Sequence, residues 1–133
     1  MNEGDPVVTP LPKAPAHAEL EGTGLQESEL LRRMVDIIVR EANPEAIILF
    51  GSRARGDARP DSDIDLLVIE HEPFSPGRSR IKEAARLYRA LGDLPASKDL
   101  LLYSRDEVAG RRSAPNHVVA RAYREGRLLY GDA

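Results

Sequence analysis

Three aspartates have the spacing that points most directly to chemistry. Asp63 and Asp65 stand two positions apart, and Asp99 follows later in the chain. On a β-strand, residues two positions apart project from one face, with side chains that start about 6 to 7 Å apart. Carboxylates converging from that distance can share divalent ions spaced about 3.5 to 4 Å apart, and oxygen ligands favour magnesium or manganese. If the segment at Asp99 forms the neighbouring strand, it adds a third carboxylate, so all three are candidate metal ligands and catalytic residues.

Gly51 and Ser52 directly follow a short apolar run and form a candidate phosphate-binding segment. A glycine lets the backbone approach a phosphate closely, the serine hydroxyl can donate to phosphate oxygens, and a helix that starts at Ser52 adds free N–H groups. Arg53 and Arg55 come next, and guanidinium groups match the charge of a triphosphate. We predict that these four residues hold the phosphates. An alternative for either arginine is to pair with an aspartate of the same loop and brace it.

Elements with strand and helix patterns must position these residues. The apolar periodicity predicts strands at 46–50, 62–70, 98–103 and 128–130, and helices at 23–42, 81–91, 104 onwards and 115–126. Alternation along the second strand places Ile64 and Leu66 on one face and Asp63 and Asp65 on the other. The order of elements predicts an α/β fold, with a small mixed sheet of three or four strands flanked by helices that lie on one side.

Several helix positions carry expectations about the core. Ile81, Ala84, Ala85 and Tyr88 recur at helical spacing, which predicts that this face is buried, and Tyr123 is expected in the core for the same reason. Capping boxes at 23–26 and 104–107 predict two helix starts, and the proline at position 115 predicts the start of the last helix. The tyrosine at position 103, on the face of the third aspartate, has two open interpretations: pocket lining or core packing.

Composition sets limits on the class of protein. The chain has 133 residues, which fits one domain, and we divide it into a disordered or loosely attached tail at 1–22 and a domain at 23–133. It has no cysteine, so a thiolate metal site is excluded. With 22 acidic and 19 basic residues, the net charge of −3 disfavours nucleic acid as a partner. No secretory signal or membrane-length apolar run is present, so we expect a cytoplasmic protein without a membrane partner.

Two motifs together resemble a known family. The segments GSRARG at 51–56 and SDIDL at 62–66 leave ten residues between Ser52 and Asp63, and this arrangement resembles the minimal nucleotidyltransferases of the DNA polymerase β superfamily. The resemblance extends from about residue 28 to residue 131. The segment KDLLLY at 98–103 stands where the family has its third catalytic strand, and EGRLLY at 125–130 resembles the family's usual ending.

The resemblance implies the nucleotidyltransferase fold and a reaction. It implies that Asp63 and Asp65 bind magnesium or manganese, and that Asp99 completes the metal site and favours deprotonation of the acceptor. It also implies that Gly51 and Ser52 hold the triphosphate of ATP, with Arg53 and Arg55 as weaker matches. The expected reaction moves a nucleoside monophosphate to a hydroxyl and releases pyrophosphate.

The acceptor is predicted by exclusion and by the same resemblance. Drug-modifying relatives need a further domain, and RNA-tailing relatives need a basic surface, whereas this chain is short and acidic. Free-standing members of this size resemble antitoxins encoded beside HEPN-type ribonuclease toxins, which implies transfer of AMP to a tyrosine of the toxin partner. Two alternatives remain: an antitoxin that neutralises its partner by binding alone, and a stand-alone small-molecule nucleotidyltransferase. Homo-oligomers and hetero-oligomers are both open.

Overall fold

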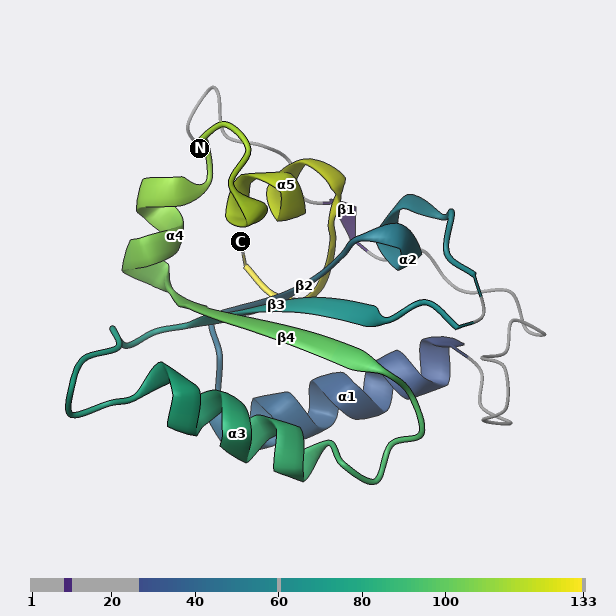
Figure 1. Ribbon diagram of the computed structural model, residues 1–133, viewed down its shortest axis with the longest axis horizontal. Coiled ribbons are helices and arrows are strands. Elements are labelled where there is room, and N and C mark those ends of the chain that lie inside the picture. The colour runs from purple at the N-terminus through teal and green to yellow at the C-terminus, as the bar shows by residue number, and fades with distance from the viewer. Residues whose placement is uncertain (1–8, 11–26, 60, 133) are drawn as a thin grey trace.

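The computed structural model describes residues 9–10, 27–59 and 61–132 (Figure 1). The strands are β1 Thr9–Pro10, β2 Ala46–Phe50, β3 Ile64–Glu70, β4 Lys98–Ser104 and β5 Arg127–Gly131. The helices are α1 Glu27–Ala42, α2 Ser52–Arg55, α3 Arg80–Ala90, α4 Arg105–Arg111 and α5 Val118–Glu125. The predicted domain boundary between residues 22 and 23, and the predicted capping box at 23–26, lie outside the described residues.

The strands form one mixed sheet in the order β1-β5-β2-β3-β4. β3 pairs with β2 in antiparallel orientation and with β4 in parallel orientation, and β5 pairs antiparallel with β2. The α/β fold class is therefore confirmed, and the four longer strands are those the sequence predicts. The two-residue strand β1, which pairs with β5, comes from the segment assigned to the tail and was not predicted.

Helices cover both faces of the sheet, so the expectation that they lie on one side was wrong. α1 and α3 lie on one face, and α4 and α5 lie on the other (Figure 1). Along β3, Ile64 and Leu66 pack in the core of the α1 and α3 face, whereas Leu67 and Ile69 pack in the core of the α4 and α5 face. Both sets of apolar side chains need cover, because exposure of either face would leave a large hydrophobic surface in water.

Local signals set most helix ends. Ser104 accepts a hydrogen bond from the backbone N–H of Glu107 while the Glu107 carboxylate accepts one from Ser104 N–H, so the second predicted capping box is confirmed. The last helix begins at Val118 rather than at Pro115, because the ring nitrogen of His117 accepts from Val119 N–H and caps the helix there. Prolines do favour a first helical turn, but here Pro115 lies in the preceding turn.

The predicted buried face of α3 was wrong in its residues. Leu87 is fully buried, but Ile81 is 81% exposed and Tyr88 is 37% exposed. Ala85 is also exposed, and Ala84 is half-buried. The helix therefore turns Leu87 toward the core and leaves the predicted stripe at the edge of the sheet. In contrast, Tyr123 on α5 is buried as expected.

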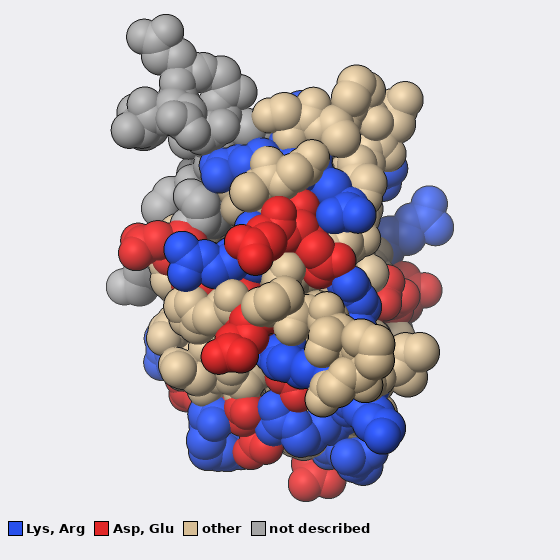
Figure 2. All heavy atoms as spheres, turned by 90° about the vertical axis from the view of Figure 1, so that its left-hand side faces the viewer, with Lys and Arg blue, Asp and Glu red and all other residues tan. Residues whose placement is uncertain are grey.

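The surface carries charges of both signs. Figure 2 shows the end of the sheet where β3 and β4 finish, with acidic and basic side chains interleaved over it. This mixture agrees with the small net charge of −3. Of the helices in the described part of the chain, none has the length and apolar character that crossing a membrane requires.

Candidate active site

Two predicted aspartates meet where β3 and β4 begin. The parallel register places Asp65 directly opposite Asp99, and Phe50 at the end of β2 lies on the other side of Asp65. Hydrogen-bonded strands lie about 4.8 Å apart, so this register brings the two aspartates onto neighbouring strands of one face. Asp63 precedes β3 by one residue and is exposed. The structure therefore brings the three predicted aspartates to one end of the sheet.

The electrostatics of Asp65 confirm that these carboxylates are close together. Burial raises the pKa of Asp65 above its usual range, and the negative charges of Asp99 and Asp63 raise it further. The positive charge of Arg55 offsets part of the increase. Clustered carboxylates repel unless a cation or a proton balances them. The described side chains do not, however, form a ready-made cage, since no group of three potential ligands among them converges closely enough for a metal ion.

Gly51 lies directly against Asp65. A Cβ atom added at residue 51 would overlap Oδ2 of Asp65, and the backbone of Gly51 has φ +75°, a conformation that side chains disfavour. Its carbonyl accepts hydrogen bonds from Ala54 N–H and Arg55 N–H, both at 3.1 Å, which starts the short helix α2. Space and backbone conformation both require glycine here. The turn places Ser52 and the start of α2 beside the aspartate cluster.

The two arginines of this loop are held by specific contacts. Arg53 is only 6% exposed and donates to the carbonyl of Ser62 at 2.8 and 3.1 Å. Arg55 pairs with Asp57 at 3.3 Å and with Glu125 on α5 at 3.1 Å. Arg55 therefore pairs with an aspartate of the loop, as the alternative interpretation had it, whereas Arg53 braces the loop through backbone carbonyls instead. Arg55 is also close enough to Asp65 to affect its pKa, so its charge lies beside the cluster.

A third arginine, Arg127, anchors the same loop from the sheet. Its Nε donates to the carbonyl of Ala54 at 2.9 Å, which ties α2 to β5. Ala54 itself is buried. Arginine contacts from within the loop and from β5 thus fix the backbone around Ser52, so the approach of this backbone to a ligand would cost little further ordering.

Comparison with known proteins agrees with this geometry. The family model described as "Polymerase beta, Nucleotidyltransferase" matches residues 32–133. The chain belongs to this nucleotidyltransferase family. A relative from Haemophilus influenzae, named "Probable protein adenylyltransferase MntA", is 39% identical over 70 residues, which is 51% of this chain and 58% of the relative. The chain thus aligns with little more than half the length of that curated relative.

A solved structure shows the same fold. A protein provisionally described as a minimal nucleotidyltransferase is 33% identical to this chain. The match covers 79% of this chain and 97% of the other, with a TM-score of 0.53. A toxin–antitoxin structure with AMP-PNP is less similar. It is 25% identical, with a TM-score of 0.49, over 75% of this chain and 73% of the other. That overlap is too loose to carry an argument about function.

Sequence reasoning missed one residue beside the nucleotidyltransferase motif. Tyr88 was predicted in the core, but its hydroxyl accepts a hydrogen bond from Leu100 N–H at 2.7 Å and donates to Oδ1 of Asp99 at 3.4 Å. Burial raises the pKa of Tyr88, and so does the charge of Asp99, although the bond from Leu100 opposes the rise. The hydroxyl therefore stays protonated and can donate to Asp99. The role was missed because Tyr88 recurs at helical spacing with apolar residues on α3, which predicts burial.

Tyr103, for which two interpretations were open, lies near the end of β4, away from the aspartates. Tyr103 is half-buried: its ring meets His117 edge-on at 5.9 Å, and it also lines a groove beside β4. None of the three aspartates lines this groove, so packing is the interpretation of Tyr103 that the structure supports.

Proposed function

We propose that this chain is a magnesium-dependent nucleotidyltransferase that moves AMP from ATP to a tyrosine hydroxyl of a HEPN-type toxin partner. The observation that carries the chemistry is the register of β3 and β4, which sets Asp65 beside Asp99 with Gly51 against Asp65. Membership of the nucleotidyltransferase family supports the reaction class. The name of the Haemophilus relative, a probable protein adenylyltransferase, supports a protein acceptor.

The aspartate cluster fits a divalent cation. Its donors are all carboxylate oxygens. Burial raises the pKa of Asp65 most, the charges of Asp99 and Asp63 raise it further, and Arg55 offsets only part of this rise. Asp63, Asp65 and Asp99 would hold magnesium, or manganese. The cation would neutralise charge on the phosphates as the reaction proceeds. Because Asp63 and Asp99 are exposed, an ion that arrives with the nucleotide can reach their carboxylates.

The phosphates would lie along the turn from Gly51 to Ser52. Gly51 leaves room for a phosphate to approach the backbone, and the hydroxyl of Ser52 can donate to its oxygens. Arg55 is 41% exposed and stands near Asp65, so it can reach toward a triphosphate. Arg53 is held by the loop carbonyls, and its proposed part is to keep this turn in place. Phosphate contact by Arg53 remains a prediction of the family resemblance.

The transfer step follows from these positions. The acceptor hydroxyl oxygen forms a bond to the α-phosphorus, the bond from that phosphorus to the bridging oxygen breaks, and pyrophosphate leaves. The proton of the hydroxyl passes to a carboxylate of Asp99. Asp99 suits this part because it is exposed at the edge strand β4, where an acceptor can reach it.

The test uses the full chain and the protein encoded by the neighbouring reading frame. Incubated with ATP and magnesium, the partner should gain the mass of AMP on a tyrosine, and its toxicity should fall. The double variant Asp63→Asn/Asp65→Asn should fold but transfer no AMP. The matched control Asp36→Asn/Asp93→Asn, which changes the same charge at residues away from the cluster, should transfer normally. Suppressed toxicity without any gain of mass would replace transfer with neutralisation by binding.

A further inference from the structure

Helix α3 exposes an apolar stripe that its sequence pattern marks for burial. Among the described residues, the exposed large hydrophobic side chains are Ile81 at 81% and Tyr88 at 37%. They stand seven positions apart, about two helical turns, so they lie on one face of α3 with Ala84 and Ala85 between them. A single exposed apolar side chain needs no explanation, but a helical stripe of them is typical of an interaction surface.

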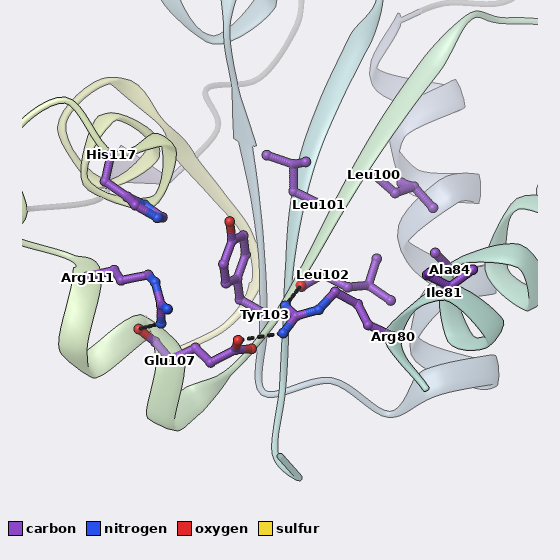
Figure 3. Close-up of a pocket in the computed structure, with 10 residues that line it drawn as sticks. All are labelled: Arg80, Ile81, Ala84, Leu100, Leu101, Leu102, Tyr103, Glu107, Arg111 and His117. Atoms are coloured by element: carbon purple, nitrogen blue, oxygen red, sulfur yellow. Dashed lines mark hydrogen bonds and ion pairs between the residues drawn. The ribbon is translucent and has the colours of Figure 1, made fainter. Parts of the chain in front are cut away.

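A groove of about 480 Å³ continues this stripe across strand β4. Ile81 and Ala84 line it from α3, and Glu107, Arg111 and His117 line it from the other side (Figure 3). The residues of β4 from Leu100 to Tyr103 form its floor. We call the α3 stripe and this groove together the α3–β4 surface.

Side chains already bond three backbone groups at the edge of β4. Leu100 N–H donates to the hydroxyl of Tyr88 at 2.7 Å, and the carbonyl of Leu102 accepts from Arg80 at 2.7 Å. At the end of the strand, Ser104 N–H donates to Glu107 at 2.9 Å. A partner strand would have to displace these bonds, so strand addition is disfavoured at this edge. The occupant that fits an apolar stripe beside a groove is therefore a helix laid in by its side chains.

Charge selects the kind of helix. Lys82 and Arg89 lie on α3 next to Ile81 and Tyr88, and within the described chain neither forms an ion pair. Arg111, on the far side of the groove, donates only to the backbone carbonyl of Glu107. These cations fit acidic residues on the flanks of an incoming helix. In a second copy of this chain, Lys82 and Arg89 would face the same positive side chains. The repulsion between like charges disfavours self-association through this surface.

We propose that the α3–β4 surface docks an amphipathic helix of the acceptor protein, with acidic residues on the flanks of its apolar face. The surface is continuous with the active site, because Tyr88 ends the stripe and donates to Asp99. A helix bound there holds the acceptor protein beside the carboxylate that takes the hydroxyl proton. This inference rests on the proposed function, since it assigns the surface that recognises the acceptor.

The test compares two surface variants with a matched control. Ile81→Glu and Lys82→Glu/Arg89→Glu alter exposed side chains of the surface, and Arg121→Glu/Arg124→Glu makes the same charge reversal on exposed residues of α5. Affinity for the protein of the neighbouring reading frame is measured by calorimetry without nucleotide. Ile81→Glu and the α3 reversal should each weaken binding about 30-fold or more, and the α5 reversal less than about 3-fold.

Two further measurements separate this inference from the proposed function. ATP affinity in the presence of magnesium should be unchanged in both surface variants, while their kcat/KM for AMP transfer to the partner falls with the lost binding. If wild type binds the partner through this surface but transfers no AMP, the proposed function fails and the docking surface stands.

Three results would overturn the docking surface. The first is wild-type affinity in both surface variants, and the second is no binding of the partner by wild type. The third is a dimer of the chain alone in sedimentation that Ile81→Glu converts to monomer, which would assign the surface to a second copy.

Discussion

The two ends of strand β3 carry acidic clusters with opposite properties. At its start, Asp63 and Asp65 meet Asp99 at an open end of the sheet. At its finish, Glu70 is 1% exposed and lies beside Glu83 on α3. Glu70 pairs with Arg78 at 2.5 Å, and Glu83 pairs with Arg86 at 2.6 Å.

The two clusters differ in how their negative charge is balanced. Burial, and after it the neighbouring Glu83, raises the pKa of Glu70 to about 7, and Arg78 offsets part of that rise. Hydrogen bonds from Glu70 and Arg86 outweigh burial and hold the pKa of Glu83 below its usual range. The glutamate cluster is thus balanced by the protein's own arginines and a proton. The aspartate cluster is left with uncompensated negative charge, as expected of a site whose cation arrives with its substrate.

The largest expected effect separates the two clusters by activity. Asp65→Asn should lower AMP transfer about 1,000-fold, because the variant loses a charged oxygen ligand for the cation. It should not lower the melting temperature without metal, because the raised pKa of Asp65 shows that its charge is unfavourable in the fold. Glu70→Gln serves as the control and should transfer AMP within about 2-fold of wild type. An equal loss of activity in both variants would erase the distinction between the clusters.

The second effect tests the fit of the backbone to the aspartate cluster. Gly51→Ala should lower transfer about 100-fold, because the added methyl overlaps Asp65 and displaces the turn that approaches the phosphates. Gly56→Ala is matched to it, since Gly56 also has positive φ, at +87°, but has open space at its Cβ position. It should lose stability through backbone strain, by about 1 kcal/mol, and keep most of the activity. Equal loss of transfer in the two variants would assign the effect to strain alone.

The third effect tests whether Tyr88 positions Asp99. Tyr88→Phe removes the hydroxyl that bonds Leu100 N–H and Asp99, so kcat for transfer should fall about 10-fold. The KM for ATP should stay the same, because Tyr88 bonds Leu100 and Asp99 and not the turn that we propose to hold the phosphates. Tyr130→Phe on β5, away from the aspartates, is the control and should keep wild-type kcat. A change in KM for ATP with constant kcat would contradict the positioning role.

The smallest effect concerns the glutamate cluster and pH. The pKa of Glu70 is raised from 4.5 to about 7 in the folded protein, so the folded state holds a proton that the unfolded state has released. Stability from this group is full below about pH 4.5 and is lost as pH rises through about 7, by about 1 kcal/mol per pH unit. Glu83 is ionised in both states over this window and adds no slope.

Urea unfolding of wild type and Glu70→Gln between pH 5 and 8 measures this slope. As the pH rises, wild type should lose free energy of unfolding relative to Glu70→Gln. A constant difference across the range would mean that the pKa of Glu70 is not raised in the folded protein.

Much of the fold followed from local patterns. β2 has the predicted bounds, and the capping box at Ser104 and Glu107 starts α4 as expected. The face of α3 was mispredicted because periodicity shows which residues could be buried but not whether another element covers them. The strand β1 was missed because two residues carry no periodic signal.

The sequence alone determined the chemistry that this chain can perform. The spacing from Gly51 and Ser52 to Asp63 and Asp65 is local, so it identified the family motif and the two carboxylates on one face. Only the tertiary structure decided that β4 pairs in parallel with β3 and sets Asp99 opposite Asp65. The register of strands distant in sequence depends on packing of the whole sheet, which no local pattern encodes.

Tertiary structure likewise decided the fate of charged and apolar side chains with similar local patterns. Burial between α3 and the end of β3 raised the pKa of Glu70 and gave it an arginine partner, whereas the open end of the sheet left the aspartates without such balance. The same packing buried Leu87 and left Ile81 in solvent. Burial and charge balance are properties of the assembled fold, because they depend on neighbours that are remote in the sequence.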